Sequence, residues 1–600
     1  MKYNFLSLLL VCSFGFSQSI MAMQASDAGA ARQPPGEAIN PKRLQEIEKL
    51  RAEAAQGKVE SQFNLGLVYA DGDGVATDFA EAHKWFLLAA NQGDVEAQVN
   101  LGIFAFRGKG TDQDYLAAMK WFQLAAKKNN RTAQFYIGVL YDNGNGVKQN
   151  YDESLKWFIL SGRQGDPDAQ FNVAYMYENG QGTKIDLSEA TNWYRIAAEA
   201  GSVKAMNRYG YAYANGVGLK QDFGMAMKWY RAAAAKGDFD AMWRVGILYE
   251  EGRGVTRDYD EALRWYRIAG EGGSASALNN IGVFYADGKG VASDYKEALK
   301  WYRMAADLGN GIAMYNIAGI YSHGLGTEKN YSEAMKWYRK AAEKNDSDAQ
   351  NNIGVYYEYG HGVEKNYVQA AYWYQLAADQ GNAAAQSNLA WLYQNGEGVK
   401  KDSRQAVKWY RLAALAGNTN AQVNLGQMYD NADGVRQDYA EAMKWYRLAA
   451  EQNDAAAQSN IGVLYELGLG VKLNSKEAAK WYQLAAAQNN ALGVSNLGAI
   501  HEDGRGVPRN DAEAFRLYRL SASLGGVDGQ SYLGSMYQDG RGTEKNYVLA
   551  YMWFEVSAVA GNKEAVEKRS EITGKMAAEQ IAKAKELSVQ CISKKYQACD

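Results

Sequence analysis

A tryptophan recurs every 36 residues along most of the chain, and this spacing constrains the fold more than any other feature. Trp85 begins the series, Trp553 ends it, and Leu517 is the one substitution among fourteen positions. Because no residue is gained or lost between these positions, all repeats have the same length. A period in this range is typical of a solenoid, in which each repeat packs only against its neighbours.

Each repeat carries residues that begin and end helices at fixed places. Asp or Asn stands seven residues before every position of the tryptophan column, as at Asp438, where its side chain can cap a helix. Glu or Gln follows three residues later in eleven repeats, as at Glu441, which predicts a capping box. Gly or Asn stands eight residues after the column, as at Asn453, and tolerates the left-handed conformation that ends a helix. With a second helix, such as 421–429, each repeat is predicted to contain two helices and two turns.

The tryptophan and the tyrosine beside it are predicted to hold the helices together. In the stretch EAMKWYRLAA, four residues spaced three or four apart form one apolar stripe: Ala442, Trp445, Tyr446 and Ala449. On the other helix of the repeat, Gly426 lets a neighbouring helix approach. We therefore interpret the aromatic pair as packing rather than as a ligand-binding pair.

These motifs, A-x-x-x-L-G-x-x-Y, G-x-G-V, D-Y-x-x-A and W-Y-x-x-A-A at a period of 36, resemble the Sel-one-like repeat (SLR) family, which is related to tetratricopeptide repeats. The resemblance covers residues 58–563. It implies an all-α fold, an α/α superhelical solenoid of about fourteen 36-residue helix-turn-helix repeats, used as an adaptor for protein complexes. Bacterial members are often exported. Some cysteine-rich secreted members bind or hydrolyse β-lactams, but no repeat of this chain contains cysteine.

The two ends of the chain differ from the repeats. Residues 1–22 combine a basic start, a short apolar core and small residues, which predicts a secretory signal peptide. Residues 23–41 hold three of the five prolines and predict a flexible leader. Residues 42–57 are predicted to form an N-terminal capping helix, and residues 564–590 a C-terminal capping helix with a polar outer face. The tail, 591–600, follows.

Two cysteines remain after removal of the predicted signal peptide, Cys591 and Cys599, both in the tail. Close cysteines commonly pair in an oxidising compartment, so a disulfide is predicted, with two free thiols as the alternative. A lipoprotein anchor at Cys12 is the alternative to a cleaved signal, although Val11 stands where a small residue is expected. We expect an exported chain, either periplasmic or secreted.

Charge and composition argue against several classes of function. The chain has 65 basic and 68 acidic residues, and a net charge of −3 creates no field suited to nucleic acid or an anionic membrane. No segment after the signal offers about 20 uninterrupted apolar residues for a transmembrane helix. His323 and His361 could approach each other in neighbouring glycine loops, but no cysteine or arranged carboxylate completes a metal site. We predict no metal, no cofactor and no catalytic residues.

An asparagine column could form a binding surface. Asn stands two residues before the Leu-Gly glycine in ten of fourteen repeats, and its amide could pair with the N–H and C=O groups of an extended peptide. In similar tetratricopeptide arrays the asparagine at this place lines a concave groove. The alternative is that the column bonds neighbouring helices and sets the superhelical pitch. The candidate groove residues are Asn64, Asn100, Asn172, Asn280, Asn316, Asn352, Asn388, Asn424, Asn460 and Asn496.

Arg208 and Arg244 interrupt this column in adjacent repeats, and Trp243 lies beside the second. Two guanidinium groups near an aromatic ring could hold a carboxylate or another acidic group, so these three residues are a candidate specificity patch. The alternative is that the arginines are solvated and that Trp243 fills a gap in the core.

Two functions fit these features. The first is an exported, non-catalytic scaffold that binds protein or peptide segments in the groove and assembles envelope or host-interaction complexes. The second is a peptidoglycan- or carbohydrate-binding repeat protein, with weak β-lactamase-like hydrolase activity. The second needs exposed aromatic platforms, for which Trp243, Trp391 and Tyr136 are the candidates.

Overall fold

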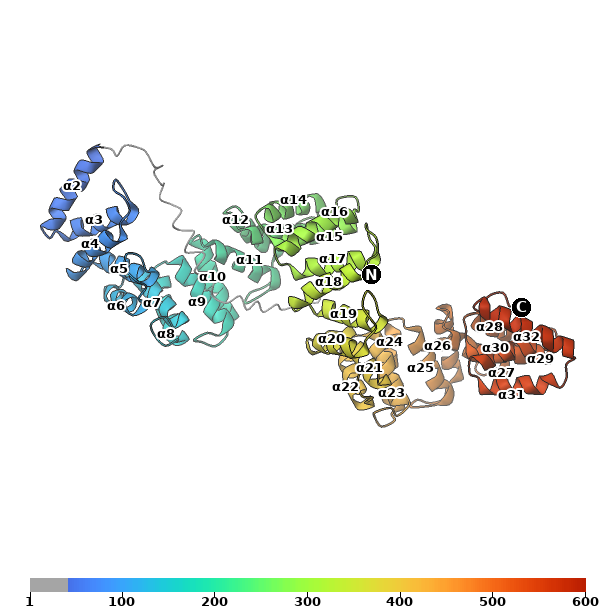
Figure 1. Ribbon diagram of the computed structural model, residues 1–600. Helices are drawn as coiled ribbons and strands as arrows, with labels where there is room; N and C mark the ends of the chain where they lie inside the picture. The colour runs from blue at the N-terminus through green and yellow to red at the C-terminus, as the bar shows by residue number, and fades with distance from the viewer. Residues whose placement is uncertain (1–40, 600) are drawn as a thin grey trace. The chain divides into compact units, whose positions relative to one another are not determined.

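The computed structural model describes residues 41–599, so the predicted signal peptide and nearly all of the predicted leader lie outside the described residues (Figure 1). Every regular element from residue 41 to residue 599 is an α-helix, and consecutive helices pack against one another within each unit. The predicted all-α solenoid is therefore confirmed. Contacts divide the chain into an N-terminal unit, Met1–Ala277, and a C-terminal unit, Leu278–Asp600.

Each repeat consists of a first helix, called here the A helix, and a second, the B helix. The A helices are α3 (Val59–Asp71), α5 (Val95–Arg107), α7 (Arg131–Asn143), α9 (Pro167–Asn179), α11 (Val203–Asn215), α13 (Phe239–Glu251), α15 (Ala275–Asp287), α17 (Gly311–His323), α19 (Ser347–Tyr359), α21 (Ala383–Asn395), α23 (Thr419–Asp430), α25 (Ala455–Leu467), α27 (Ala491–Asp503) and α29 (Val527–Asp539). The B helices are α4 (Phe79–Asn91), α6 (Tyr115–Ala126), α8 (Tyr151–Arg163), α10 (Leu187–Glu199), α12 (Phe223–Ala234), α14 (Tyr259–Glu271), α16 (Tyr295–Asp307), α18 (Tyr331–Glu343), α20 (Tyr367–Asp379), α22 (Ser403–Leu415), α24 (Tyr439–Glu451), α26 (Ser475–Ala487), α28 (Asp511–Ser523) and α30 (Tyr547–Val559).

The predicted N-caps of the B helices are confirmed, but the predicted capping box is wrong. The Asp438 carboxylate accepts a hydrogen bond from the Glu441 backbone N–H at 2.9 Å, as an N-cap does. A capping box would also need the backbone N–H of Asp438, which instead donates to the Tyr429 carbonyl oxygen at 3.0 Å. The Glu441 side chain pairs with Lys444 on its own helix. The hydrogen bond to Tyr429 therefore occupies the Asp438 N–H that a capping box would need.

The predicted ends of the B helices are also confirmed. All fourteen Gly or Asn residues of this column have positive φ, and Asn453, with φ of 65°, is one of four asparagines among them. Asn accepts this left-handed conformation at lower cost than most residues with a side chain. The column thus turns the chain from each B helix toward the next A helix.

The glycine column of the A helices makes room for the ring that follows each tryptophan. A Cβ atom added to Gly426 would lie 2.5 Å from Cε1 of Tyr446, which is completely buried. The tryptophans of the repeat column are all buried or half-buried. The interpretation of the Trp-Tyr pair as packing is therefore confirmed.

The two ends of the array are closed by further helices. The first described helix, α2 (Pro41–Ala55), packs against α3. The region predicted as one C-terminal helix, 564–590, contains two, α31 (Lys563–Thr573) and α32 (Ala578–Ser593), and both contact α30. The break follows Thr573, where Gly574 caps the first helix and a short turn leads to the second. This turn lets the second helix cover the last B helix.

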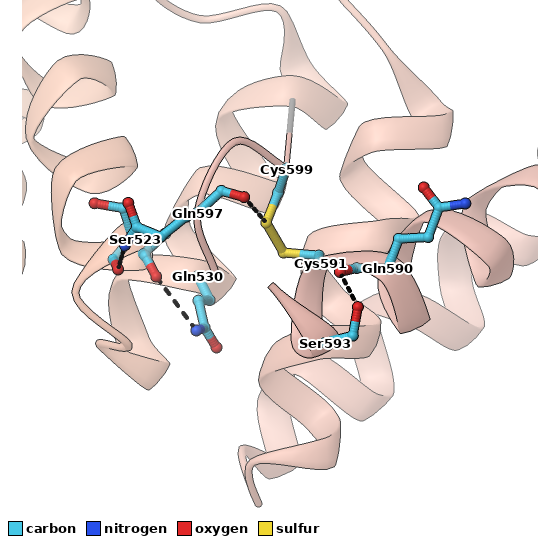
Figure 2. Close-up of a disulfide and its surroundings, with 8 residues drawn as sticks. Ser523, Gln530, Gln590, Cys591, Ser593, Gln597 and Cys599 are labelled. Atoms are coloured by element: carbon cyan, nitrogen blue, oxygen red, sulfur yellow. Dashed lines mark hydrogen bonds between the residues drawn. A yellow bond between two sulfur atoms is a disulfide. The ribbon is translucent and has the colours of Figure 1, made fainter. Parts of the chain in front are cut away.

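A disulfide joins Cys591 and Cys599, the predicted pair (Figure 2). It closes the tail into a loop, and the Gln597 side chain within that loop donates to the Ser523 backbone carbonyl oxygen at 2.8 Å. Tyr596 lies against Gly525 in the turn after α28. The tail is thus attached to the last repeats rather than extended into solvent.

Candidate functional site

The asparagine column lies on the A helices at the boundary between core and solvent. All ten residues predicted as groove residues are half-buried, so the column is neither fully exposed nor enclosed. We call the solvent-accessible side of the A helices the A face. In the C-terminal unit α25 contacts α27 and α27 contacts α29 directly, so neighbouring A helices can present one continuous surface there.

Part of the column connects consecutive A helices. The Asn316 amide nitrogen donates to Oδ1 of Asn279 at 3.1 Å, and the Asn388 amide nitrogen donates to Oδ1 of Asn351 at 3.0 Å. Between them, Asn352 donates to the hydroxyl oxygen of a tyrosine on the previous A helix at 3.3 Å. These bonds agree with the structural alternative, in which the column sets the stacking of repeats. Among described residues none donates to the carbonyl oxygens of Asn316 and Asn388, which leaves both as acceptors.

The remaining asparagines do not all behave alike. The Asn100 amide nitrogen donates to the Glu96 carbonyl oxygen of its own helix at 2.9 Å. The amide nitrogen of Asn460 is buried and has no hydrogen-bond partner. A buried donor without a partner costs about 1–3 kcal/mol, so the Asn460 amide lowers the stability of its repeat.

The candidate specificity patch is held within the chain. The Arg244 Nε donates to Asp240 Oδ2 at 3.1 Å, and its guanidinium carbon lies 5.3 Å from the ring centre of Trp243. A guanidinium nitrogen of the other arginine, Arg208, lies 3.9 Å from a carboxylate oxygen of Glu178. Both guanidinium groups therefore face an acidic residue of the chain itself, and an acidic ligand would compete with these carboxylates.

The three candidate aromatic platforms differ in exposure. Tyr136 is buried and stacks on Phe122 with 4.8 Å between ring centres. Trp243 is half-buried, and its Nε1 is buried without a partner. Trp391 is 39% exposed and is the remaining platform for stacking.

Buried polar groups link the repeats in a way that sequence reasoning missed. The Gln422 amide nitrogen donates to the Ala414 carbonyl oxygen at 3.1 Å, and its side-chain oxygen accepts from Gln452 at 2.9 Å. Glutamines aligned with Gln422 and Gln452 form the same pair in other repeats. Their period of 36 was the available signal, because a polar residue kept at one place in an apolar stripe usually has a buried partner.

A second network joins a tyrosine of the B helix to the end of the preceding A helix in seven repeats. The Tyr482 hydroxyl donates to Glu466 at 2.6 Å, and equivalent bonds form in six other repeats. In the repeat of α7 and α8, Phe158 replaces this tyrosine, and Asp142 stands at the acidic position. Burial raises the pKa of Asp142 to about 6. A carboxyl group that lacks the usual hydroxyl donor thus titrates near neutral pH.

No metal or membrane site is evident within residues 41–599. No group of three His, Cys, Asp or Glu residues in this part of the chain could hold a metal ion. His323 hydrogen-bonds through Nδ1 to the Gly319 carbonyl oxygen, and His361 stacks on Tyr331 with 4.5 Å between ring centres. None of the helices described has the length and apolar character needed to cross a membrane.

The family model of the Sel1 repeat matches fourteen consecutive segments of the chain. The matched residues are 59–94, 95–130, 132–166, 167–202, 203–238, 239–274, 275–310, 311–346, 347–382, 383–418, 419–454, 455–490, 491–526 and 527–562. These segments coincide with the pairs of A and B helices described above.

Two solved structures of similar repeat proteins cover large parts of the chain. One is the crystal structure of c5321, a protective antigen of uropathogenic Escherichia coli with an SLR fold. Its sequence is 36% identical to this chain, and the match spans 74% of this chain and 96% of the c5321 chain, with a TM-score of 0.59. A Sel1 repeat protein from Oxalobacter formigenes is 31% identical, covers 52% of this chain and 90% of its own, and has a TM-score of 0.42. No curated protein matches the chain. The chain belongs to the Sel1 repeat family.

Proposed function

We propose that this protein is an exported, non-catalytic scaffold that binds extended protein segments along its A face. A scaffold of this kind brings partners together by offering many repeats of one surface. The Asp and Asn residues immediately before the B helices serve as N-caps, which gives these side chains a structural role.

The asparagine column carries this proposal. Its ten members reach solvent at the same place in ten of the fourteen repeats, and Asn316 and Asn388 retain carbonyl oxygens that can accept from a peptide backbone. Hydrogen bonds to backbone groups would hold an extended segment whatever its sequence. Export is supported by the apolar N-terminal segment, and the similar Escherichia coli protein is a protective antigen.

The test compares capture by the native chain and by two variants. In the first, four column residues are changed to alanine: Asn280, Asn316, Asn352 and Asn388. In the matched control, four polar residues on B helices are changed to alanine: Gln123, Asn192, Gln375 and Gln483. Cross-linked complexes are purified and analysed for both proteins and glycan fragments, and circular dichroism verifies that helicity is unchanged.

We expect protein partners to be captured by the native chain and by the control variant but lost from the four-asparagine variant. Partners retained equally by all three forms would contradict binding along the column. Glycan fragments captured alone, and equally by all three, would instead favour the carbohydrate-binding function. That alternative rests on the exposed ring of Trp391, so changing Trp391 to alanine should then abolish glycan capture.

A further inference from the structure

The A helices of the C-terminal unit share an unusual charge pattern. Seven of them, from α17 to α29, contain no Lys and no Arg. Their acidic residues all reach solvent and are Asp348, Glu358, Asp430, Glu466, Glu502, Asp503, Asp528 and Asp539. Some B helices of the same unit instead carry exposed lysines, such as Lys336 and Lys444, each paired with a glutamate of its own helix. The A face of this unit is therefore acidic.

Four acidic residues toward the C-terminal end of this unit are paired with arginines of the chain itself, whereas Asp528 accepts a hydrogen bond from the Asn562 amide nitrogen. Arg505 forms ion pairs with Glu466 and Asp503. Arg541 forms ion pairs with Glu502 and Asp539. Each arginine comes from the glycine loop after an A helix. A cationic ligand would have to displace these guanidinium groups, so this end of the A face is the less available one.

Three carboxylates further toward the N-terminus have no such cation. Asp348 accepts from the Asn382 amide at 2.7 Å, Glu358 from a tyrosine hydroxyl at 2.6 Å, and Asp430 from another at 3.3 Å. Among the described residues none forms an ion pair with these three groups. Neutral donors leave the negative charges in place, so α19 and α23 present uncompensated carboxylates on either side of α21. Lys365 is near enough to attract Glu358, but its ammonium lies over the ring of Tyr367 at 4.6 Å.

Two exposed aromatic rings lie on the same helices. Trp391 on α21 is 39% exposed, and Tyr359 at the end of α19 is 62% exposed. The face of an aromatic ring attracts a cation, and such contacts contribute about 0.5–2 kcal/mol. Packed helices lie about 8–10 Å apart, so one extended segment can reach rings and carboxylates on neighbouring repeats.

We propose that the A face of α19, α21 and α23 binds an extended protein segment through its Lys or Arg side chains, using the carboxylates of Asp348, Glu358 and Asp430 and the rings of Tyr359 and Trp391. This inference rests on the proposed function and adds the chemical class of the partner. A neutral sugar would use the tryptophan ring, but it would gain little from three uncompensated carboxylates. A cationic side chain can contact both the tryptophan ring and the carboxylates.

The experiment measures binding of labelled peptides to the full chain by fluorescence anisotropy. Three peptides share one length and one set of alternating alanines, and their other positions are all Lys, all Gln or all Glu. We expect the Lys peptide to bind at least tenfold more tightly than the Glu peptide at low salt. The difference should shrink at high salt, because screening weakens contacts between exposed charges.

Two charge variants locate the site. Glu358→Gln with Asp430→Asn keeps the hydrogen-bonding shape and removes two charges of the proposed site. The matched control, Asp307→Asn with Glu451→Gln, removes two exposed charges from B helices of the same unit. We expect the first variant to weaken Lys peptide binding about tenfold and the control to leave it within about twofold. Loss in both variants would show that only the net charge matters and would overturn the site.

Variants of Trp391 distinguish a cationic side chain from a sugar as the ligand of this site. Trp391→Ala should weaken the Lys peptide several-fold, and Trp391→Phe should retain part of that affinity, because both aromatic rings attract cations. A chitin-type oligosaccharide should not compete with the peptide, and full competition would reassign the ring to carbohydrate binding. Equal binding of all three peptides would overturn this inference while leaving peptide capture intact. If no peptide binds, the proposed function itself is wrong.

Discussion

Replacement of Gly426 by valine tests the packing of each repeat most directly. A Cβ atom at this position would lie 2.5 Å from Cε1, 2.7 Å from Cδ1 and 3.1 Å from Cζ of Tyr446. Ordinary carbon contacts are about 3.5–4.0 Å, so the added atom overlaps the ring by about 1 Å. The ring is completely buried and its hydroxyl is bonded to Asp430, so it has little freedom to move.

The expected cost follows from these distances. Overpacking a core by a few carbons typically costs about 1–3 kcal/mol, and valine adds three carbons next to an immobile ring. Valine has a higher helix propensity than glycine, but this difference offsets only about 0.3 kcal/mol of the cost. We therefore expect the repeat of α23 and α24 to lose about 3 kcal/mol, which raises its opening equilibrium about a hundredfold.

The measurement is hydrogen–deuterium exchange resolved along the chain, because each repeat opens with its neighbours rather than with the whole array. Amides of α23 and α24 should exchange faster while those of α17 stay unchanged. Gly319 supplies the control, since it lies within α17 and a Cβ there would meet nothing within 4 Å. Gly319→Val should leave protection the same or slightly higher. If Gly426→Val behaves like Gly319→Val, the explanation of the glycine column is wrong.

Two further predictions concern a titrating carboxyl group and the tail. Burial raises the pKa of Asp142 from 3.8 to about 6, so its ionisation lowers stability as pH rises from about 4 to about 6. Asp142→Asn should therefore raise the unfolding free energy at pH 7 by up to about 3 kcal/mol and leave it unchanged near pH 3, as urea titrations would show. Cys599→Ser should destabilise α32 by about 2.5 kcal/mol, the chain-entropy value for the eight-residue separation, and leave the helicity of the repeats intact. Loss of helicity along the whole chain would contradict this expectation.

Local sequence patterns predicted the helix boundaries because those boundaries depend on local chemistry. An Asp or Asn side chain caps its own helix, and a Gly or Asn with positive φ ends one, so both columns could be read from the sequence. The close approach of a neighbouring helix at Gly426 could also be predicted, because glycine has no side chain. The capping box failed because the Asp438 N–H bonds to Tyr429 across the connection between helices, which no local pattern reveals.

The candidate site was harder to predict because its properties depend on which residues of different repeats meet. The asparagine column was identified from its period, but the bond from Asn316 to Asn279 appears only when the helices stack. The acidic character of the A face was hidden by a net charge of −3, which averages these acidic A helices with lysines and arginines elsewhere in the chain. Neither Trp391 nor Tyr359 shows its exposure in the sequence, since most described Trp and Tyr residues are buried or half-buried.

The repeat architecture also explains why specificity should arise at a few exceptional positions. Packing demands the same residue type at most places in every repeat, and those columns therefore cannot distinguish one partner from another. The solvent-accessible positions of the A helices are free of this demand, and there the repeats differ. Trp391 stands where the neighbouring repeats have Val355 and Gln427. Because each repeat contacts mainly its neighbours, such a change can create a binding site over two or three repeats without disturbing the others.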